Sequence, residues 1–140
     1  MPTDKEYAQE EEFLQGLPFF NWGALLMPPI WGPGHGEFLV ILFYPMWLFV
    51  DNLIYAAVHE CTPLSIVLAV AALAVILLAT VAYGRLSQPK AAHAAADAGK
   101  TREEYLATER KWAVACGIIA VVFLVLATVY NLTIRPNVGA

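Results

Sequence analysis

PLSIVLAVAALAVILLATVAY, residues 63–83, decides the fold, because these 21 consecutive residues carry no charge. As an α-helix the stretch would be about 30 Å long, which matches the hydrocarbon layer of a bilayer. Residues 112–132 form a second uncharged stretch of the same length, and residues 38–58 form a third in which Asp51 is the one charged residue. The sequence therefore predicts three membrane-spanning helices.

The composition of the whole chain agrees with this prediction. Of its 140 residues, 59% are hydrophobic and 14% are charged, and a water-soluble domain of this size cannot bury so much apolar surface. The alternative is that these stretches are buried helices of a large soluble protein, but the chain offers no second layer to cover them. We therefore predict an all-α membrane protein with three transmembrane helices, preceded by an interfacial or re-entrant segment rich in Pro, Gly and Trp.

The predicted organisation has four parts. They are an acidic cytoplasmic N-terminal arm (1–16), the interfacial or re-entrant segment (17–36), a three-helix membrane domain (37–134) with a cytoplasmic loop (85–111), and a C-terminal tail (135–140). In the arm, Thr3 and Glu6 have the spacing of a capping box, which predicts a short helix. In the loop, Thr101 and Glu104 have the same spacing, so we expect a helix to begin after a break at Gly99 and to continue into the third span.

The basic residues predict the orientation in the membrane. Six of the eight Lys and Arg residues lie in the loop 85–111, whereas the turn between the first two spans, residues 59–62, has none. Short loops rich in Lys and Arg stay on the cytoplasmic side. The N-terminus is therefore expected inside and the C-terminus outside, although Arg135 falls on the predicted outer side. The acidic start, MPTDKEYAQEEEFLQG, differs from the basic and then apolar start of a secretory signal.

The segment before the first span reads NWGALLMPPIWGPGHGEF, residues 21–38. Its apolar part is too short to span a bilayer, and two adjacent prolines interrupt any longer helix. Asn21 is a favourable N-cap, so we expect two helical turns up to Met27 and then a bent connection. Tryptophan favours the membrane boundary, where the segment is expected to lie unless it forms a re-entrant hairpin. The residues assigned to this segment are Asn21, Trp22, Pro28, Pro29, Trp31 and His35.

Residues 20–31, FNWGALLMPPIW, resemble the entry segment of a family of uncharacterised small bacterial integral membrane proteins, a domain of unknown function. The family pattern is an F-N-W-x-A start and a P-x-W ending, which here falls on Phe20, Asn21, Trp22, Ala24, Pro29 and Trp31. The strings FYPMWLFVDN and YNLTIRP look similar to the same group. The resemblance implies a multi-pass protein of the bacterial cytoplasmic membrane, and it implies no catalytic residue.

Asp51 lies about 20 Å along the first predicted span, and therefore within the hydrocarbon layer. A carboxylate at that depth costs several kcal/mol unless it is protonated, paired or hydrated. Tyr44, Trp47, Asp51, Tyr55 and His59 follow one another at intervals of three or four residues, so they share one helix face. We expect this face to point toward protein rather than lipid.

A partner for Asp51 is expected at the outer end of the third span. Thr128, Asn131 and Arg135 share a face there, and antiparallel packing brings them to the depth of Asp51. Arg135 can reach back along its aliphatic stem to the carboxylate. Such a group of residues either fixes the register of the helices or forms a proton- or cation-binding site. The predicted polar intramembrane cluster is Asp51, Asn52, Tyr55, Asn131 and Arg135.

Motifs for catalysis or metal binding are absent from the sequence, which has no Gly-rich phosphate loop, Cys pair or zinc-binding spacing. His35 and Glu37 lie together at the inner boundary, but neither a nucleophile nor a second acid accompanies them. Cys61 and Cys116 are predicted too far apart for a disulfide. We therefore expect a protein that is not an enzyme and has no cofactor or metal site. The net charge of −4 also disfavours nucleic acid as a partner.

Two functions stay open. The first is a non-catalytic membrane subunit that self-associates or joins a larger complex, since small residues such as Ala72, Ala113 and Gly117 let helices approach closely. The alternative is an oligomeric minimal transporter or channel with a proton or cation site centred on Asp51. Several copies would then be needed, because three spans are too few to enclose a path. The expected partners in both cases are the lipid bilayer and other membrane helices.

Overall fold

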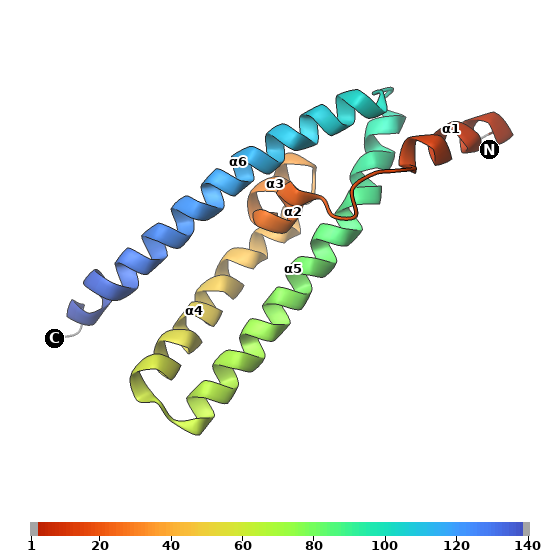
Figure 1. Cartoon of the computed structure of the whole chain (residues 1–140). Helices are drawn as coiled ribbons and strands as arrows, with labels where there is room; N and C mark the ends of the chain where they lie inside the picture. Colours follow the sequence, from red (N-terminus) through yellow and green to blue (C-terminus); the bar gives the residue numbers. More distant parts are fainter. Residues whose placement is uncertain (1–2, 139–140) are drawn as a thin grey trace.

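The computed structural model describes residues 3–138, and every regular element among them is a helix (Figure 1). In chain order the elements are α1 (Asp4–Leu14), α2 (Trp22–Leu26), α3 (Pro28–Gly34), the 3-10 helix η1 (Phe38–Leu42), α4 (Phe43–Glu60), α5 (Pro63–Asp97), α6 (Arg102–Val129), the π-helical turn η2 (Tyr130–Ile134) and the 3-10 turn η3 (Arg135–Asn137). The all-α prediction is confirmed. The ends of the predicted arm and tail, residues 1–2 and 139–140, lie outside the described part.

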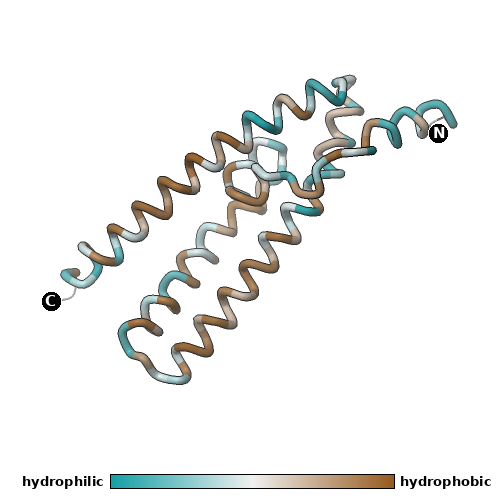
Figure 2. Tube along the Cα trace, viewed as in Figure 1, coloured by the Kyte–Doolittle hydropathy of each residue, from teal (hydrophilic) through white to brown (hydrophobic). Residues whose placement is uncertain are grey.

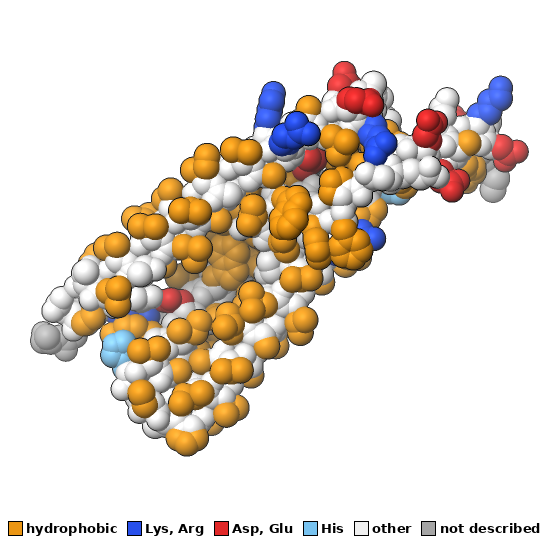
Figure 3. Space-filling model, in the orientation of Figure 1, with side chains coloured by type: hydrophobic (Ala, Val, Ile, Leu, Met, Phe, Trp, Pro, Cys, Tyr) orange, Lys and Arg blue, Asp and Glu red, His pale blue; other side chains and the backbone are white. Residues whose placement is uncertain are grey.

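Three helical stretches are long and apolar enough to cross a membrane: Phe38–Glu60, Pro63–Asp97 and Arg102–Asn137. Most of their side chains are exposed in the isolated chain, and hydrophobic groups cover the visible face of the three long helices (Figure 3). Hydrophilic residues gather at α1 and around the turn between α5 and α6 (Figure 2). A surface of this kind is stable only against lipid or other apolar groups, so the chain is a multi-pass membrane protein.

The loop expected between the second and third spans is almost entirely helical. α5 continues to Asp97 through Pro89, and α6 begins at Arg102, where Thr101 and Glu104 form the expected capping box. A four-residue turn, 98–101, joins the two helices, and Gly99 in it has a φ of +76°, a conformation that glycine adopts easily. Both helices therefore project beyond the membrane-length stretches as polar extensions.

The first two spans form an antiparallel hairpin. α4 ends at Glu60, and Cys61 takes the left-handed conformation that often closes a helix. The Thr62 hydroxyl then accepts a hydrogen bond from the Ser65 amide and caps α5, with Pro63 in its first turn. These local signals make the connection short, so α4 and α5 pack along each other.

The segment before the first span is folded as a wedge of two short helices, α2 and α3, between α5 and α6. Ala24, Met27 and Trp31 of the wedge pack with Cys116 of α6 in the most deeply buried cluster of the chain. The bent connection expected after Met27 is wrong, because α3 is helical from Pro28 to Gly34. The two prolines occupy the first positions of that helix, where the missing N–H and the fixed φ angle favour helix formation.

The third span is joined to the rest of the chain mainly at its two ends. At the end near the α5–α6 turn, α6 packs on α2 and only lightly on α5. At the other end, polar residues of η2 and η3 contact α4. Between these ends the side chains of Ile118, Val121 and Leu124 are 61% to 69% exposed. The membrane part of α6 therefore stands largely uncovered.

Candidate functional site

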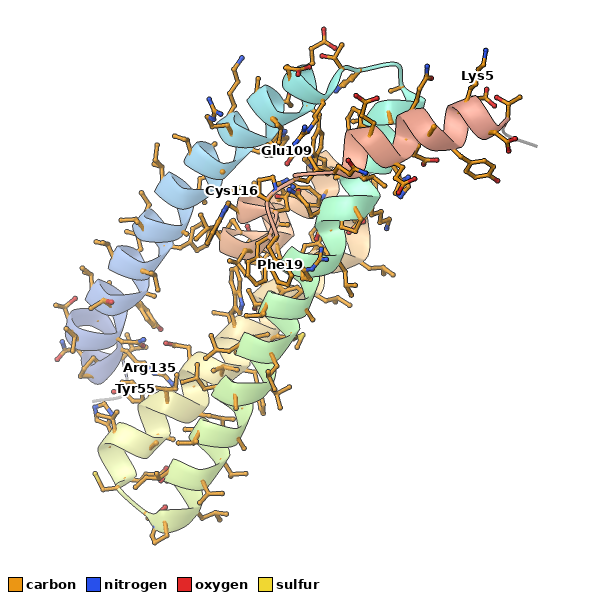
Figure 4. The ribbon with its side chains drawn as sticks, turned by 45° about the vertical axis from the view of Figure 1, so that its right-hand side comes forward. Lys5, Phe19, Tyr55, Glu109, Cys116 and Arg135 are labelled. Atoms are coloured by element: carbon orange, nitrogen blue, oxygen red, sulfur yellow. The ribbon has the colours of Figure 1, made fainter. Side chains whose placement is uncertain are left out.

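Two groups of polar side chains lie at opposite ends of α6, as the positions of Glu109, Tyr55 and Arg135 show (Figure 4). We call the first the Glu109 cluster, which consists of Asn21, Trp31, His35, Gln88 and Glu109. We call the second the Asp51 cluster, which consists of Asp51, Asn52, Tyr55, Asn131 and Arg135. These are the two candidate sites.

Glu109 of α6 accepts hydrogen bonds from three side chains of the wedge. Its Oε2 atom accepts from Asn21 Nδ2 at 2.8 Å and from Trp31 Nε1 at 2.9 Å, and its Oε1 atom lies 2.8 Å from His35 Nε2. The Glu109 and His35 side chains are only 12% and 20% exposed. Charge-assisted bonds of this length hold the wedge firmly against α6.

His35 is positioned as a cation. Its Nδ1 atom lies 2.8 Å from the Trp31 carbonyl oxygen, and its Nε2 atom faces the Glu109 carboxylate. Both partners only accept hydrogen bonds, so both ring nitrogens must carry a hydrogen. Burial opposes the charge, but the bonds to Glu109 and Trp31 and the charges of Glu109 and Glu37 outweigh it and raise the pKa of His35 above its ordinary value. The ring also stacks on Trp31 at 3.8 Å between centroids, which suits a cation.

Gln88 of α5 extends the cluster to a second helix. Its side-chain oxygen accepts hydrogen bonds from Asn21 Nδ2 at 3.2 Å and from the Tyr105 hydroxyl at 2.9 Å, while its Nε2 atom donates to the Pro18 carbonyl at 3.1 Å. Asn21 also caps α2 by accepting from the Ala24 amide at 3.0 Å. Each polar group in this buried network has a partner, which is the condition for stability in a low-dielectric environment.

Glu37 lies beside the Glu109 cluster and has partners of its own. It accepts a 2.7 Å hydrogen bond from the Tyr83 hydroxyl and forms an ion pair with Lys90, both on α5. Partial burial raises the pKa of Glu37. The hydrogen bonds from Lys90 and Tyr83 and the charges of Lys90 and His35 lower it by more, so the pKa lies below its ordinary value. Glu37 is therefore held as a carboxylate.

A cleft of about 310 Å³ opens next to these acids, between α3 and the polar extensions of α5 and α6. Its polar lining includes His35, Glu37, Lys90, Lys100, Thr108 and Glu109. Among residues 3–138 no group of three or more His, Cys, Asp or Glu side chains is placed to hold a metal ion. The cleft is thus lined by a mixture of cationic, acidic and hydroxyl groups.

The Asp51 cluster connects α4 to the far end of α6. The Asp51 carboxylate accepts from Asn131 Nδ2 at 2.7 Å and pairs with Arg135 at 3.3 Å. The Arg135 guanidinium also donates to Asn52 Oδ1 at 2.5 Å, and it lies 3.7 Å from the centre of the Tyr55 ring. Asp51 is 38% and Arg135 is 22% exposed. The carboxylate therefore already has a cation beside it.

The residues assigned from the sequence occupy different environments. Asn21, Trp31 and His35 belong to the Glu109 cluster, while Pro28 and Pro29 are buried in the wedge and Trp22 is 53% exposed. The expectation that no second acid accompanies His35 and Glu37 is wrong, because Glu109 lies against His35.

Sequence reasoning missed Glu109, Gln88 and Tyr105. A signal existed in α6, where Tyr105, Glu109, Trp112 and Cys116 recur at intervals of three or four residues and so share one helix face. An acid on a face with buried aromatic residues indicates a partner across that face.

The described cysteines are both free, so the wedge and the spans are held by packing and polar contacts alone. Cys61 is exposed at the α4–α5 turn, and Cys116 is buried beneath the wedge. Comparison with protein-family models, with curated proteins and with solved structures finds no match to this chain.

Proposed function

We propose that the protein is a non-catalytic membrane subunit that works by association, in the first place with a second copy of itself, through the uncovered membrane face of α6. The observation that carries this proposal is the way α6 is attached. Polar clusters fix both ends of α6. In the stretch between these ends, the side chains of Ile118, Val121 and Leu124 are largely exposed. A helix that is rigidly held but open along its middle presents a constant surface to another membrane helix.

The small residues of α6 support close packing of that surface. A Cβ atom added at Gly117 would meet only Leu26 Cδ1 of α2, at an ordinary distance of 3.6 Å, so Gly117 lies at the edge of the uncovered face, beside α2. Ala113 lies one turn before it, and both residues are half-buried. Small side chains let helix backbones approach, which strengthens van der Waals contact in a bilayer where the hydrophobic effect between helices is absent.

A non-catalytic role is supported by the saturation of the polar side chains. The Glu109 carboxylate accepts three hydrogen bonds, and both ring nitrogens of His35 are used. A general acid or base needs a free position toward a substrate. The cluster instead uses its hydrogen bonds to hold α2, α3, α5 and α6 together.

The proposed location is the cytoplasmic membrane of a bacterium, with the N-terminus inside and the C-terminus outside. The basic residues of the α5 and α6 extensions support this orientation, since Lys and Arg are enriched on the cytoplasmic side. Arg85 lies over the Phe19 ring at 4.2 Å, at the end of the apolar part of α5, where aromatic and basic residues commonly meet the lipid head groups.

The oligomeric mass of the purified full-length chain in lipid nanodiscs tests the proposal. We expect a mass of at least two copies for the wild type and a shift toward one copy for Val121→Trp, which places a bulky ring on the α6 face. Leu78→Trp is the matched control, because Leu78 on α5 is also well exposed, at 70% against 61% for Val121, and lies outside the proposed interface. A wild type with a single copy and no co-purifying protein would contradict the proposal.

The alternative function, an oligomeric transporter or channel, draws support from the partial exposure of Asp51 within the membrane. It is the weaker candidate, because Arg135 occupies the place beside the carboxylate that a transported cation would take. Ion or proton flux in proteoliposomes distinguishes the two functions. Flux that Asp51→Asn abolishes would favour the transporter over the association role.

A further inference from the structure

In the cleft between α3, α5 and α6, the acidic side chains have partners within the described part of the chain, whereas several hydrogen-bond donors do not. Both carboxylates in its wall are fully engaged, since Glu109 bonds to the wedge and Glu37 bonds to Tyr83 and Lys90. Neither acid needs a further cation. A ligand of the cleft must therefore satisfy the groups that remain.

The remaining groups are donors. Lys100 lines the cleft and forms none of the ion pairs found among residues 3–138. The Thr108 hydroxyl lines it too, and no hydrogen bond involves that hydroxyl in the described part of the chain. Lys90 uses one ion pair, to Glu37, and its side chain is 71% exposed, so its ammonium group can donate again.

Lys100 also borders a second cleft, which Glu6, Glu10 and Asp97 line. None of these three carboxylates forms an ion pair with Lys100 among the residues that the structure describes. The Lys100 ammonium is therefore a free positive charge in the lining of the first cleft, which Lys90 lines as well.

Another part of the cleft lining is apolar. Ala91, Ala94 and Ala95 of α5 line it together with the Trp112 ring of α6. Trp112 ends the charged extension of α6 and begins its apolar stretch, so the cleft opens where the polar ends of the helices meet the membrane-length part. A ligand with an anionic group and a small apolar part fits this combination.

From this arrangement we infer that the cleft binds a phosphate ester, with the phosphate oxygens accepting hydrogen bonds from Lys90, Lys100 and Thr108 and the carbon part lying against the alanines and Trp112. Phosphate offers several acceptor oxygens and a negative charge, and lysine binds it as a point charge. The ester is carried either by a lipid head group or by a soluble small molecule, and both present the same chemistry to the cleft.

Two probes separate the two sources of the ester. Glycerol 3-phosphate is titrated by calorimetry into the full-length protein in phosphatidylcholine nanodiscs, with glycerol as the uncharged analogue. In parallel, native mass spectrometry in detergent compares retention of phosphatidic acid with retention of phosphatidylcholine. We expect saturable binding of glycerol 3-phosphate, or selective retention of phosphatidic acid, and no binding of glycerol.

Variants test whether the cleft is the binding place. Lys100→Met keeps the ion pairs of Glu37 and Glu109 intact and should weaken binding about tenfold, the usual cost of losing a charged hydrogen bond. Thr108→Val should weaken it severalfold. Lys111→Met is the matched control, because it removes the same charge from an exposed position of α6 outside the cleft lining.

The inference is overturned if neither probe binds the wild type, if Lys100→Met binds as well as the wild type, or if Lys111→Met weakens binding as much as Lys100→Met. The last result would indicate attraction to net charge alone. None of these variants alters the membrane face of α6, so the outcome is independent of the proposed association.

Discussion

Glu109 receives hydrogen bonds from Asn21, Trp31 and His35, all from the wedge that precedes the first span. A carboxylate that replaces its water with three protein donors is stable only while the donors stay in place. The donors depend on the acid in the same way, because His35 is held as a partly buried cation beside it. The attachment of the wedge to α6 therefore depends mainly on one side chain, that of Glu109.

Replacing Glu109 by Gln keeps the shape of the side chain and removes its charge. We expect a loss on the order of 2 kcal/mol in the free energy of unfolding, because His35 is left as a partly buried cation without its anion. Unfolding of the purified protein in mixed micelles, followed by circular dichroism, measures the change. Glu103→Gln, at an exposed position of the same helix, should leave the stability unchanged.

The raised pKa of His35 predicts a dependence of stability on pH. The folded state binds the His35 proton more tightly than the unfolded chain, so the stabilisation is complete below about pH 6.5 and is lost as the pH rises through the raised value. The groups that face the ring are Glu109, Glu37 and the Trp31 carbonyl. Melting temperatures measured from pH 6 upward should fall for the wild type more steeply than for His35→Gln.

A wild type and a His35→Gln variant with parallel pH profiles would show that His35 is not charged in the folded protein. Glu37 contributes in the opposite direction, because its lowered pKa makes stability fall as the pH drops below its ordinary value of about 4.5. The measurement therefore stays above that range, where only the His35 effect is expected to change.

Individual side chains differ in how well the sequence reveals them. Asn21 is recognisable as a helix cap because capping depends on neighbours in the chain. Glu109 is not recognisable from the sequence, because its partners lie 74 to 88 positions earlier in the chain. In addition, a charged residue in a basic loop is usually exposed to solvent, so its charge alone does not indicate a buried partner. Sequence patterns thus find local contacts, whereas the central residue of the cluster depends on tertiary packing.

Among the elements, α2 decides how close α5 and α6 come to each other. It packs on both, and a glycine faces it from each long helix: Gly84 from α5 and Gly117 from α6. A Cβ atom at Gly84 would lie 2.9 Å from Leu25 Cβ, which is too close, whereas one at Gly117 would lie 3.6 Å from Leu26 Cδ1, an ordinary contact. The two glycines therefore differ in what they tolerate.

The same substitution at both glycines tests this packing. In a helix, Gly→Ala by itself adds about 1 kcal/mol of stability, and Gly117→Ala should show that gain. Gly84→Ala should instead cost about 2 kcal/mol, because the wedge must shift away from α5. Denaturant unfolding of both variants gives the comparison, and equal stabilities would contradict the tight contact at Leu25.

The Asp51 cluster makes a separate prediction for the contact between α4 and the end of α6. Removing the charge in Asp51→Asn and Arg135→Met should each destabilise the fold, and a double-mutant cycle should give a coupling free energy of about 1 kcal/mol, typical of polar pairs between membrane helices. A coupling near zero would mean that the pair does not hold α6 to α4.

At the scale of the whole molecule, the number and length of the spans follow from apolar stretches and were predictable. The separation of α6 from the hairpin of α4 and α5 was not, because it results from a wedge that hydrophobicity alone does not place. Pro28 and Pro29 separate α2 from the next helix, as the sequence predicts, but they also begin α3, which the sequence does not predict. Composition therefore predicts the class of fold, and the packing of short elements determines its shape.

Topology is testable with the native cysteines. Cys61 is exposed at the α4–α5 turn and Cys116 is buried, so a membrane-impermeant maleimide added to intact bacterial cells should label Cys61. In a Cys61→Ser background, Lys100→Cys should be labelled only after the membrane is permeabilised. Labelling of Lys100→Cys in intact cells would reverse the proposed orientation.

The long sequence separation within the Glu109 cluster has a consequence for biosynthesis. Asn21, Trp31 and His35 leave the ribosome well before Glu109 does, so the first two spans enter the bilayer while the wedge still has no counter-charge and no second wall. The N-terminal segment can settle only after the last helix has been made. The segment that is synthesised first is therefore the last to dock. If synthesis stops before α6 is complete, the wedge has no Glu109 to bind and stays undocked.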